Sequence, residues 1–165
     1  MNKTLCGMAL CAAAPFASAA ESGKPASSAA PAAQQITHAG SQAPSFGSAE
    51  YFTGRVRVDP LFTPNASINA SGAYVTFEPG ARSAWHTHPA GQRLVVTSGM
   101  GLTQEWGKPV QTLRQGDVVW CPPGVKHWHG AAPHSAMTHL AVGSNVNGVT
   151  VNWMEKVTDE EYNAR

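Results

Sequence analysis

Residues 80–92 read GARSAWHTHPAGQ, and residues 116–129 read GDVVWCPPGVKHWH. Each stretch holds two histidines separated by one residue: His86 and His88 in the first, His127 and His129 in the second. On a β-strand, residues two apart point to the same face of the sheet. If both pairs face the interior of one barrel, up to four imidazoles converge there, and leaving them unpaired would be costly. The two stretches therefore predict a metal site or a hydrogen-bonded histidine network.

The sequence on either side of these stretches predicts short strands separated by turns. Apolar or β-rich runs recur, with breakers such as Pro79-Gly80, Ser98-Gly99 and Pro122–Gly124 between them, which is typical of an all-β sandwich or barrel. The expected strands are 51–58, 73–77, 83–87, 93–97, 101–106, 110–113, 117–121, 126–129, 137–142 and 149–155. Helical periodicity is expected only at 158–162, as one terminal turn.

The N-terminal segment is expected to lie outside this fold. Lys3 opens a short positive region, residues 5–16 are mostly apolar or small, and Ala17-Ser18-Ala19 offers a small-x-small cleavage site. This layout indicates a secretory signal peptide over residues 1–20 and export to the periplasm. The alternative is an Ala-rich leader that stays attached. Residues 21–42, rich in Ala, Ser and Pro, are interpreted as a flexible linker, and residues 43–165 as the folded domain.

Composition excludes several classes of partner. The formal net charge is +1 and only 13% of the residues are charged, so nothing indicates binding to nucleic acid or to an anionic membrane surface. The sequence has no apolar run of the roughly 20 residues needed to span a bilayer. Two of the three cysteines fall in the predicted signal peptide, and Cys121 remains. A single cysteine cannot form an internal disulfide, and Cys121 is expected to be a small core residue.

The spacing around the histidines resembles the paired sequence motifs of cupins. Gly80 precedes His86 by six residues, Gly99 follows Gln92 by seven, and a second block holds Gly116, Pro122, Gly124 and His127. This resemblance implies a single cupin jelly-roll barrel, also called a double-stranded β-helix, with one divalent metal ion inside it. By matching position, the metal ligands would be His86, His88, Gln92 and His127.

Gln92 departs from the general cupin pattern, which has glutamate at that position. A glutamine offers a neutral carbonyl oxygen, so three neutral imidazoles and Gln92 would leave the double charge of the metal uncompensated. Such an ion should be a stronger Lewis acid and favour an anionic oxygen. In the alternative, Gln92 only forms a nearby hydrogen bond and the site is a three-histidine centre. Manganese, iron, cobalt, nickel and zinc all suit such a site.

The stretch from about Ser41 to Tyr162 resembles, more closely, the bacterial cupin-type hydroxynitrile lyases. The segments that carry this resemblance are 51–54 (YFTG), 58–62 (VDPLF), 75–82 (VTFEPGAR), 85–89 (WHTHP), 91–92 (GQ), 116–120 (GDVVW), 126–133 (KHWHGAAP), 136–141 (AMTHLA) and 153–155 (WME). In that subgroup glutamine is the fourth ligand, so Gln92 agrees with it. The resemblance implies manganese(II) and reversible cleavage of aromatic cyanohydrins, such as (R)-mandelonitrile, into aldehyde and cyanide.

The resemblance also assigns His129 and His139 as acid/base groups. His129 shares a strand face with the expected ligand His127, and a neutral histidine could take the proton of the substrate hydroxyl. The alternatives are that His129 orients a ligand and that His139 is a buried, hydrogen-bonded residue. An apolar pocket for the aromatic ring is expected from Ala73, Val75, Phe77 and Leu94, each of which could equally be plain barrel core.

Other functions remain open because fold and metal do not fix the reaction. The same ligands could activate dioxygen in a metal-dependent dioxygenase, which would require oxygen whereas a lyase would not. A non-catalytic periplasmic protein that binds a metal or small ligand is a further alternative, and cyanohydrin cleavage could be a side activity. The resemblance also implies a homo-oligomer, a dimer or a tetramer, whose subunits could pair along the 51–58 segment.

Overall fold

Strand β7, Gln92–Glu105, organises the fold because it belongs to two sheets. Its first half pairs with β11 (Met137–Gly143) and β9 (Val118–Cys121), and its second half pairs with β10 (His127–Ala131) and β8 (Gln111–Arg114). The prediction of two separate strands here is wrong, because the chain continues through Ser98 and Gly99. Gly99 takes a positive φ of 76°, which only glycine adopts readily, and the strand crosses from one sheet to the other without stopping.

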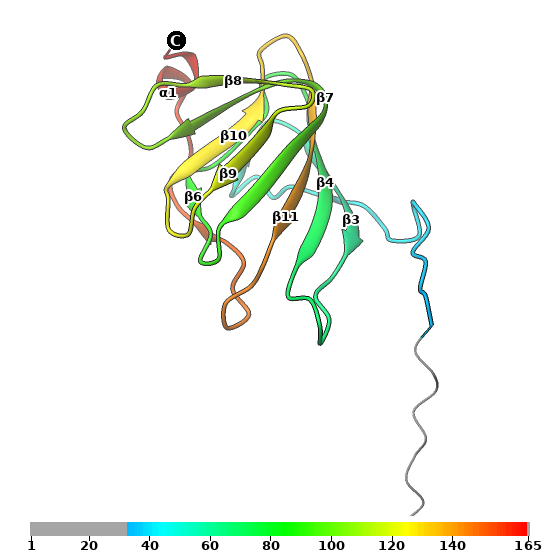
Figure 1. Cartoon of the computed structure of the whole chain (residues 1–165). Coiled ribbons are helices and arrows are strands. Elements are labelled where there is room, and N and C mark those ends of the chain that lie inside the picture. The colour runs from blue at the N-terminus through cyan, green and yellow to red at the C-terminus, as the bar shows by residue number, and fades with distance from the viewer. Residues whose placement is uncertain (1–32, 165) are drawn as a thin grey trace, which may run out of the picture. The chain divides into compact units, whose positions relative to one another are not determined.

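The two sheets are antiparallel throughout and curl around a common interior (Figure 1). The first sheet continues from β11 through β4 (Ser71–Phe77) and β3 (Val56–Phe62) to β1 (Ser45–Phe46). In the second sheet, β10 pairs with β5 (Arg82–Ser83) and β6 (His86–Thr87), while β2 (Phe52–Thr53) pairs with β5 and β12 (Asn152–Trp153) with β6. The all-β barrel is therefore confirmed.

This computed structural model describes residues 33–164. The predicted signal peptide lies outside them, as does most of the predicted linker. Residues 35–165 form one compact unit. Within the described residues, no helix has the length and apolarity to cross a membrane.

Buried side chains form two separate clusters, on opposite faces of the histidine-bearing strands. The first holds Val56, Phe77, Ala81, Val96, Leu113, Ala131 and Met137. The second holds Trp85, Leu102, Trp128, Val157 and Tyr162. Trp85 precedes His86, and Trp128 lies between His127 and His129, so strand alternation sends each tryptophan away from the histidines. The histidine strands are thus packed from behind by large aromatic rings.

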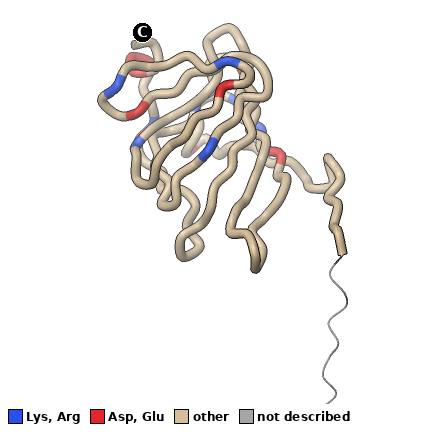
Figure 2. Tube along the Cα trace, viewed as in Figure 1, with Lys and Arg blue, Asp and Glu red and all other residues tan. Residues whose placement is uncertain are grey.

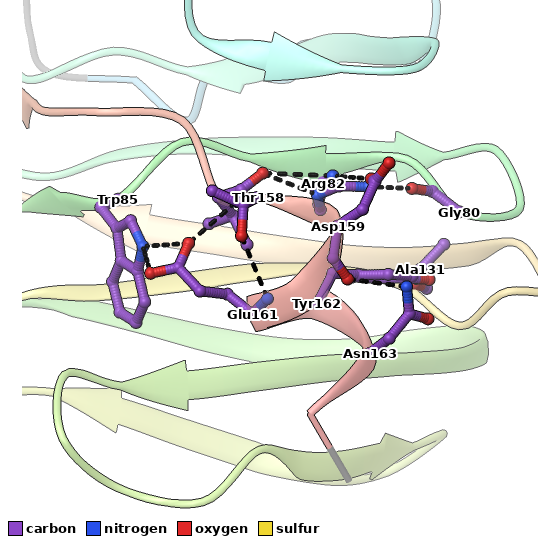
Figure 3. Close-up of polar contacts among 10 residues, drawn as sticks. Gly80, Arg82, Trp85, Ala131, Thr158, Asp159, Glu161, Tyr162 and Asn163 are labelled. Atoms are coloured by element: carbon purple, nitrogen blue, oxygen red, sulfur yellow. Dashed lines mark hydrogen bonds and ion pairs between the residues drawn. The ribbon is translucent and has the colours of Figure 1, made fainter.

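A short C-terminal helix, α1 (Asp159–Asn163), covers the second cluster and confirms the expected terminal turn. Thr158 and Glu161 form a reciprocal capping box at its start, which satisfies backbone N–H groups that would otherwise lack partners. Figure 3 shows how the helix is held: Tyr162 donates its hydroxyl to the Ala131 carbonyl at 2.7 Å, and Glu161 accepts from the indole N–H of Trp85 at 3.3 Å.

Arg82 anchors the same helix from β5. Arg82 is only 5% exposed, and its guanidinium donates to the Val157 carbonyl at 3.1 and 3.2 Å and lies 2.5 Å from a carboxylate oxygen of Asp159. It also stacks over the Tyr162 ring, 4.7 Å from its centroid. These contacts fix the segment that follows β12 (Figure 3). β12 in turn pairs with the strand of His86.

Candidate metal centre

His86 and His127 face each other because their strands pair at these residues. β6 and β10 are antiparallel with His127 opposite His86, and the two ring centroids are 4.3 Å apart. His88 lies just beyond β6 with its ring centroid 5.1 Å from that of His86, and His129 follows on the same face of β10, 5.2 Å from His86. All four side chains are buried. The convergence expected from the two His-x-His pairs is present.

Three of these rings are oriented by backbone carbonyls. The Nδ1 atoms of His86 and His127 lie 2.9 Å from the carbonyl oxygens of Ala84 and Val125, two residues upstream in each case. A carbonyl can only accept a hydrogen bond, so each Nδ1 carries the proton and each Nε2 has a free lone pair. The Nδ1 of His88 makes the same bond, 2.7 Å long, to the Thr150 carbonyl. Such bonds fix the tautomer and ring orientation of histidine ligands.

Four buried side-chain atoms have no hydrogen-bond partner in the described part of the chain, and one of them is Nδ1 of His139. The other three are His88 Nε2, His127 Nε2 and the side-chain oxygen Oε1 of Gln92. Buried polar atoms are rarely left unsatisfied, and two imidazole nitrogens with an amide oxygen are suitable ligands for a divalent first-row metal. The donor set therefore fits a metal ion.

His129 lies as near to the centre as the predicted ligands do. One nitrogen from each of His86, His127 and His129 falls within 4.8 Å of the others, whereas the expected third histidine was His88. The Nδ1 of His129, however, already pairs with Nε2 of His139 at 3.2 Å. The sequence predicted that His129 would share a face with His127; that it lies as close to His86 and His127 as a ligand would is a finding of the structure.

His139 is fully buried and contacts His129 from β11, which belongs to the other sheet. Phe77 packs against both rings, with its centroid 5.6 Å from each. The pairing follows from the barrel itself, because β10 and β11 belong to opposite sheets and both turn alternate side chains inward. The two histidines are thus hydrogen-bonded to each other at a buried position.

A cavity of about 350 Å³ opens beside the histidines. His86, His88, Gln92, His129 and His139 line it, together with apolar residues. Two of the four predicted pocket residues, Ala73 and Val75, are on its wall, but Phe77 and Leu94 are fully buried and do not line it. Lining residues that sequence reasoning missed are Phe52, Val58, Pro60, Phe62, Ala141, Val151 and Trp153.

Among the described residues, no Asp, Glu, Lys or Arg lines this cavity. The loops at residues 63–70 and 144–151 are also free of these residue types, and Figure 2 shows the charged residues at other places along the chain trace. The wall is therefore formally neutral apart from its histidines. It favours a small, uncharged and largely apolar ligand with a polar group that reaches the histidines.

Comparison with known proteins places this geometry in a family. The cupin domain family matches residues 73–143. An (R)-mandelonitrile lyase from Granulicella tundricola is 57% identical over 128 residues, which cover 78% of this chain and 98% of that protein. The chain belongs to the cupin family. The resemblance predicted from the sequence motifs is thereby confirmed.

Solved structures agree with this assignment. A cupin-like protein from Thermotoga maritima superposes with a TM-score of 0.68 at 45% sequence identity, covering 78% of this cupin and 95% of that chain. The polyketide cyclase RemF from Streptomyces resistomycificus superposes with a TM-score of 0.63 at 13% identity, covering 79% and 91% of the two chains. The second likeness concerns the fold alone.

Burial keeps the five clustered histidines of this cupin neutral near pH 7. Removal from water lowers the pKa of His127 and of His139 to about 4. Burial lowers the pKa of His86 and His129 well below the ordinary value, and neighbouring histidines lower it further. Burial also lowers the pKa of His88. Neutral imidazoles are what both metal coordination and general-base catalysis require.

Cys121 and His134 lie outside the candidate metal centre. Cys121 is a buried free thiol on β9, and burial raises its pKa to about 11. It is therefore a core residue and a poor nucleophile or ligand. His134 is exposed in the loop after β10.

Proposed function

We propose that this cupin is a metal-dependent lyase of the hydroxynitrile lyase type, which reversibly cleaves an aromatic cyanohydrin into an aldehyde and hydrogen cyanide. The observation that carries the proposal is the buried His129–His139 pair, which lies next to His86 and His127 in a neutral, apolar cavity. The 57% identity to an (R)-mandelonitrile lyase supports the same reaction.

The residues that would hold the metal are His86, His88, Gln92 and His127. Support comes from the Nδ1 bonds of the three histidines to backbone carbonyls and from the unpartnered Oε1 of Gln92. All four ligands are neutral, so a bound divalent ion keeps its full charge and lowers the pKa of a substrate hydroxyl near it. We infer manganese(II) from the resemblance; iron, cobalt, nickel and zinc also suit these donors.

His129 would serve as the base. In the tautomer that donates Nδ1–H to Nε2 of His139, the other ring nitrogen of His129 would present a lone pair and accept the substrate hydroxyl proton. As the O–H bond breaks, the oxygen forms the carbonyl double bond and cyanide leaves with the electrons of the carbon–carbon bond. The protonated pair then returns the proton to cyanide, which leaves as hydrogen cyanide. General acid–base catalysis of this kind contributes roughly 10²–10⁴-fold in rate.

The neutral wall explains the choice of an uncharged substrate. Ala73, Val75 and Ala141 offer small apolar surfaces beside the histidines, and the Trp153 ring lies 4.9 Å from that of His86. A ring of benzene size fits a cavity of about 350 Å³. A carboxylate or ammonium group would lose its hydration there without gaining a partner of opposite charge other than the metal.

An anaerobic assay tests the proposal. Manganese-loaded protein is mixed with racemic mandelonitrile, and benzaldehyde release is followed against metal-free protein. Metal-dependent release without oxygen is the expected result. Release that requires oxygen would indicate a dioxygenase, and no release from protein that still holds its metal would indicate a binding protein.

A further inference from the structure

His88 differs from the other two histidines in what orients it. The carbonyls that hold His86 and His127 lie two residues upstream on their own chain segments. The carbonyl that holds His88 belongs to Thr150, which is 62 residues away in the loop between β11 and β12. The orientation of His88 therefore depends on the position of a loop at the mouth of the cavity.

That loop is a miniature hairpin of defined geometry. Val146 and Val149 exchange two backbone hydrogen bonds of 2.9 and 3.0 Å, and both residues between them have positive φ, 52° at Asn147 and 83° at Gly148. An Asn-Gly pair with positive φ at both positions is the type I′ turn of two-residue hairpins. Asn145 reinforces the turn by accepting the Gly148 N–H at 3.2 Å. Thr150 follows the hairpin directly, so the hairpin and its carbonyl are placed together.

A pair of asparagines ties this hairpin to the loop between β3 and β4. Asn69 donates its side-chain amide to the Asn145 carbonyl at 2.9 Å, and Asn145 donates its own amide to Oδ1 of Asn69 at 2.7 Å. The strands that flank the two loops are also joined, by a bond from the Ser71 hydroxyl at the start of β4 to the Gly143 carbonyl at the end of β11, 3.3 Å long. Both loops contribute residues to the wall of the cavity.

We propose that the two hydrogen bonds between Asn69 and Asn145, called the clasp below, position the metal ligand His88 through the Thr150 carbonyl. The inference rests on the proposed function, because it assumes that His88 binds the metal. Asn69 is exposed, Asn145 is half-buried, and neither lines the cavity, so they would act only through the hairpin. Both loops line the cavity, so a ligand bound there would lie against the same elements that orient His88.

The test compares manganese affinity, measured by isothermal titration, among variants of the full chain. Asn69→Ala removes both clasp bonds and leaves the hairpin's own bonds intact. Asn163→Ala is the matched control, an exposed asparagine in α1 whose amide bonds the Asp159 carbonyl. Changing the hydrogen-bond partner of a histidine ligand typically weakens metal binding roughly 10–100-fold. The clasp does not contact His88 itself and acts through its partner Thr150, so we expect a smaller loss of manganese affinity, roughly 3–10-fold, in Asn69→Ala. Asn163→Ala should lose none.

A His88→Ala background shows whether the effect passes through His88. The proposal predicts that Asn69→Ala weakens binding no further once His88 is absent, as in a double-mutant cycle with full coupling. An equal loss in both backgrounds, or unchanged affinity in the native background, would overturn it.

Nuclear magnetic resonance of the metal-free protein separates this inference from the proposed function. The Nδ1–H proton of His88 is held by Thr150, so in Asn69→Ala its resonance should move upfield and exchange faster with water. If the native chain binds no manganese yet this proton responds, the metal function falls and the positioning clasp stands. If manganese binds and neither affinity nor this proton responds, the clasp falls and the metal function stands.

Discussion

His139 Nε2 lies 3.2 Å from His129 Nδ1, and neither ring is more than 5% exposed. Two imidazoles in such contact can pass one proton between them away from water. The pair joins opposite sheets of the barrel, so the acid/base group is assembled by the fold and not by any local motif. Its other side faces the ligand cluster, which is where a substrate proton would have to be taken up.

Removing His139 should stop catalysis and leave metal binding intact. In His139→Ala, His129 loses the partner that fixes its tautomer, so we expect kcat to fall roughly 10²–10⁴-fold with manganese affinity within about threefold of native. The measurements are steady-state cleavage of mandelonitrile and manganese titration. His134→Ala, in an exposed loop, serves as control. A fully active His139→Ala protein would refute the acid/base assignment.

Removing His127, in contrast, should abolish metal binding. His127→Ala takes away a buried Nε2 that has no other partner among the described residues, so we expect manganese binding to be lost. Metal content after dialysis, measured by mass spectrometry, checks this, and His134→Ala is again the matched control. Full metal occupancy in His127→Ala would remove this residue from the ligand set.

Replacing Gln92 by glutamate should separate affinity from activity. Gln92→Glu supplies a carboxylate that neutralises part of the metal's charge, so we expect manganese to bind roughly tenfold tighter and cleavage to slow by roughly tenfold. Gln111→Glu adds the same charge at an exposed position of β8 and should change neither. Unchanged affinity in Gln92→Glu would mean that Gln92 does not touch the metal.

The metal-free protein should lose stability in mild acid. Burial lowers the pKa of His127 and His139 to about 4, whereas an ordinary histidine has a pKa of 6.5. Between these values the unfolded chain binds protons that the folded chain excludes, so the stability present above pH 6.5 is lost as the pH falls toward 4. Each such histidine contributes about 1.4 kcal/mol per pH unit. Urea unfolding across this window measures the slope, and a flat profile contradicts the burial of neutral histidines.

The C-terminal helix should depend on Arg82 more than on Asp159. Arg82 is buried and donates to the Val157 carbonyl, whereas the Asp159 side chain is 82% exposed. We therefore expect Asp159→Ala to lower the free energy of unfolding by less than about 1 kcal/mol, and Arg82→Leu by about 2–3 kcal/mol. Chemical denaturation of both variants measures this. Equal losses would show that the ion pair and not the carbonyl bonds holds the helix.

The barrel and its histidine face could be predicted from the sequence because both depend on local pattern. Alternation placed His86, His88, His127 and His129 on inward faces, and glycine and proline marked the turns. Strand continuity could not be predicted in the same way. Ser98-Gly99 has the composition of a turn, yet β7 continues through it. The part of β7 up to Gly99 pairs with β11 and the part from Gly101 pairs with β10. This pairing is a property of the tertiary fold.

The pocket and the supporting contacts were harder to predict for a similar reason. Phe77 and Val75 are separated by one residue and share a face of β4, but only Val75 reaches the cavity, because Phe77 fills the space behind His129 and His139. Trp153 lines the cavity through the pairing of β12 with β6, which no local pattern reveals. The Asn147-Gly148 turn, in contrast, does carry a recognisable signal for the hairpin that holds His88.

The position of the metal tests the account most directly. Crystals of manganese-loaded protein would give an anomalous difference peak at the ion. The account predicts a peak bound by Nε2 of His86, His88 and His127 and by Oε1 of Gln92, with the His129–His139 pair intact beside it. A peak held instead by His86, His127 and His129 would take the proposed base into the coordination sphere and contradict the mechanism.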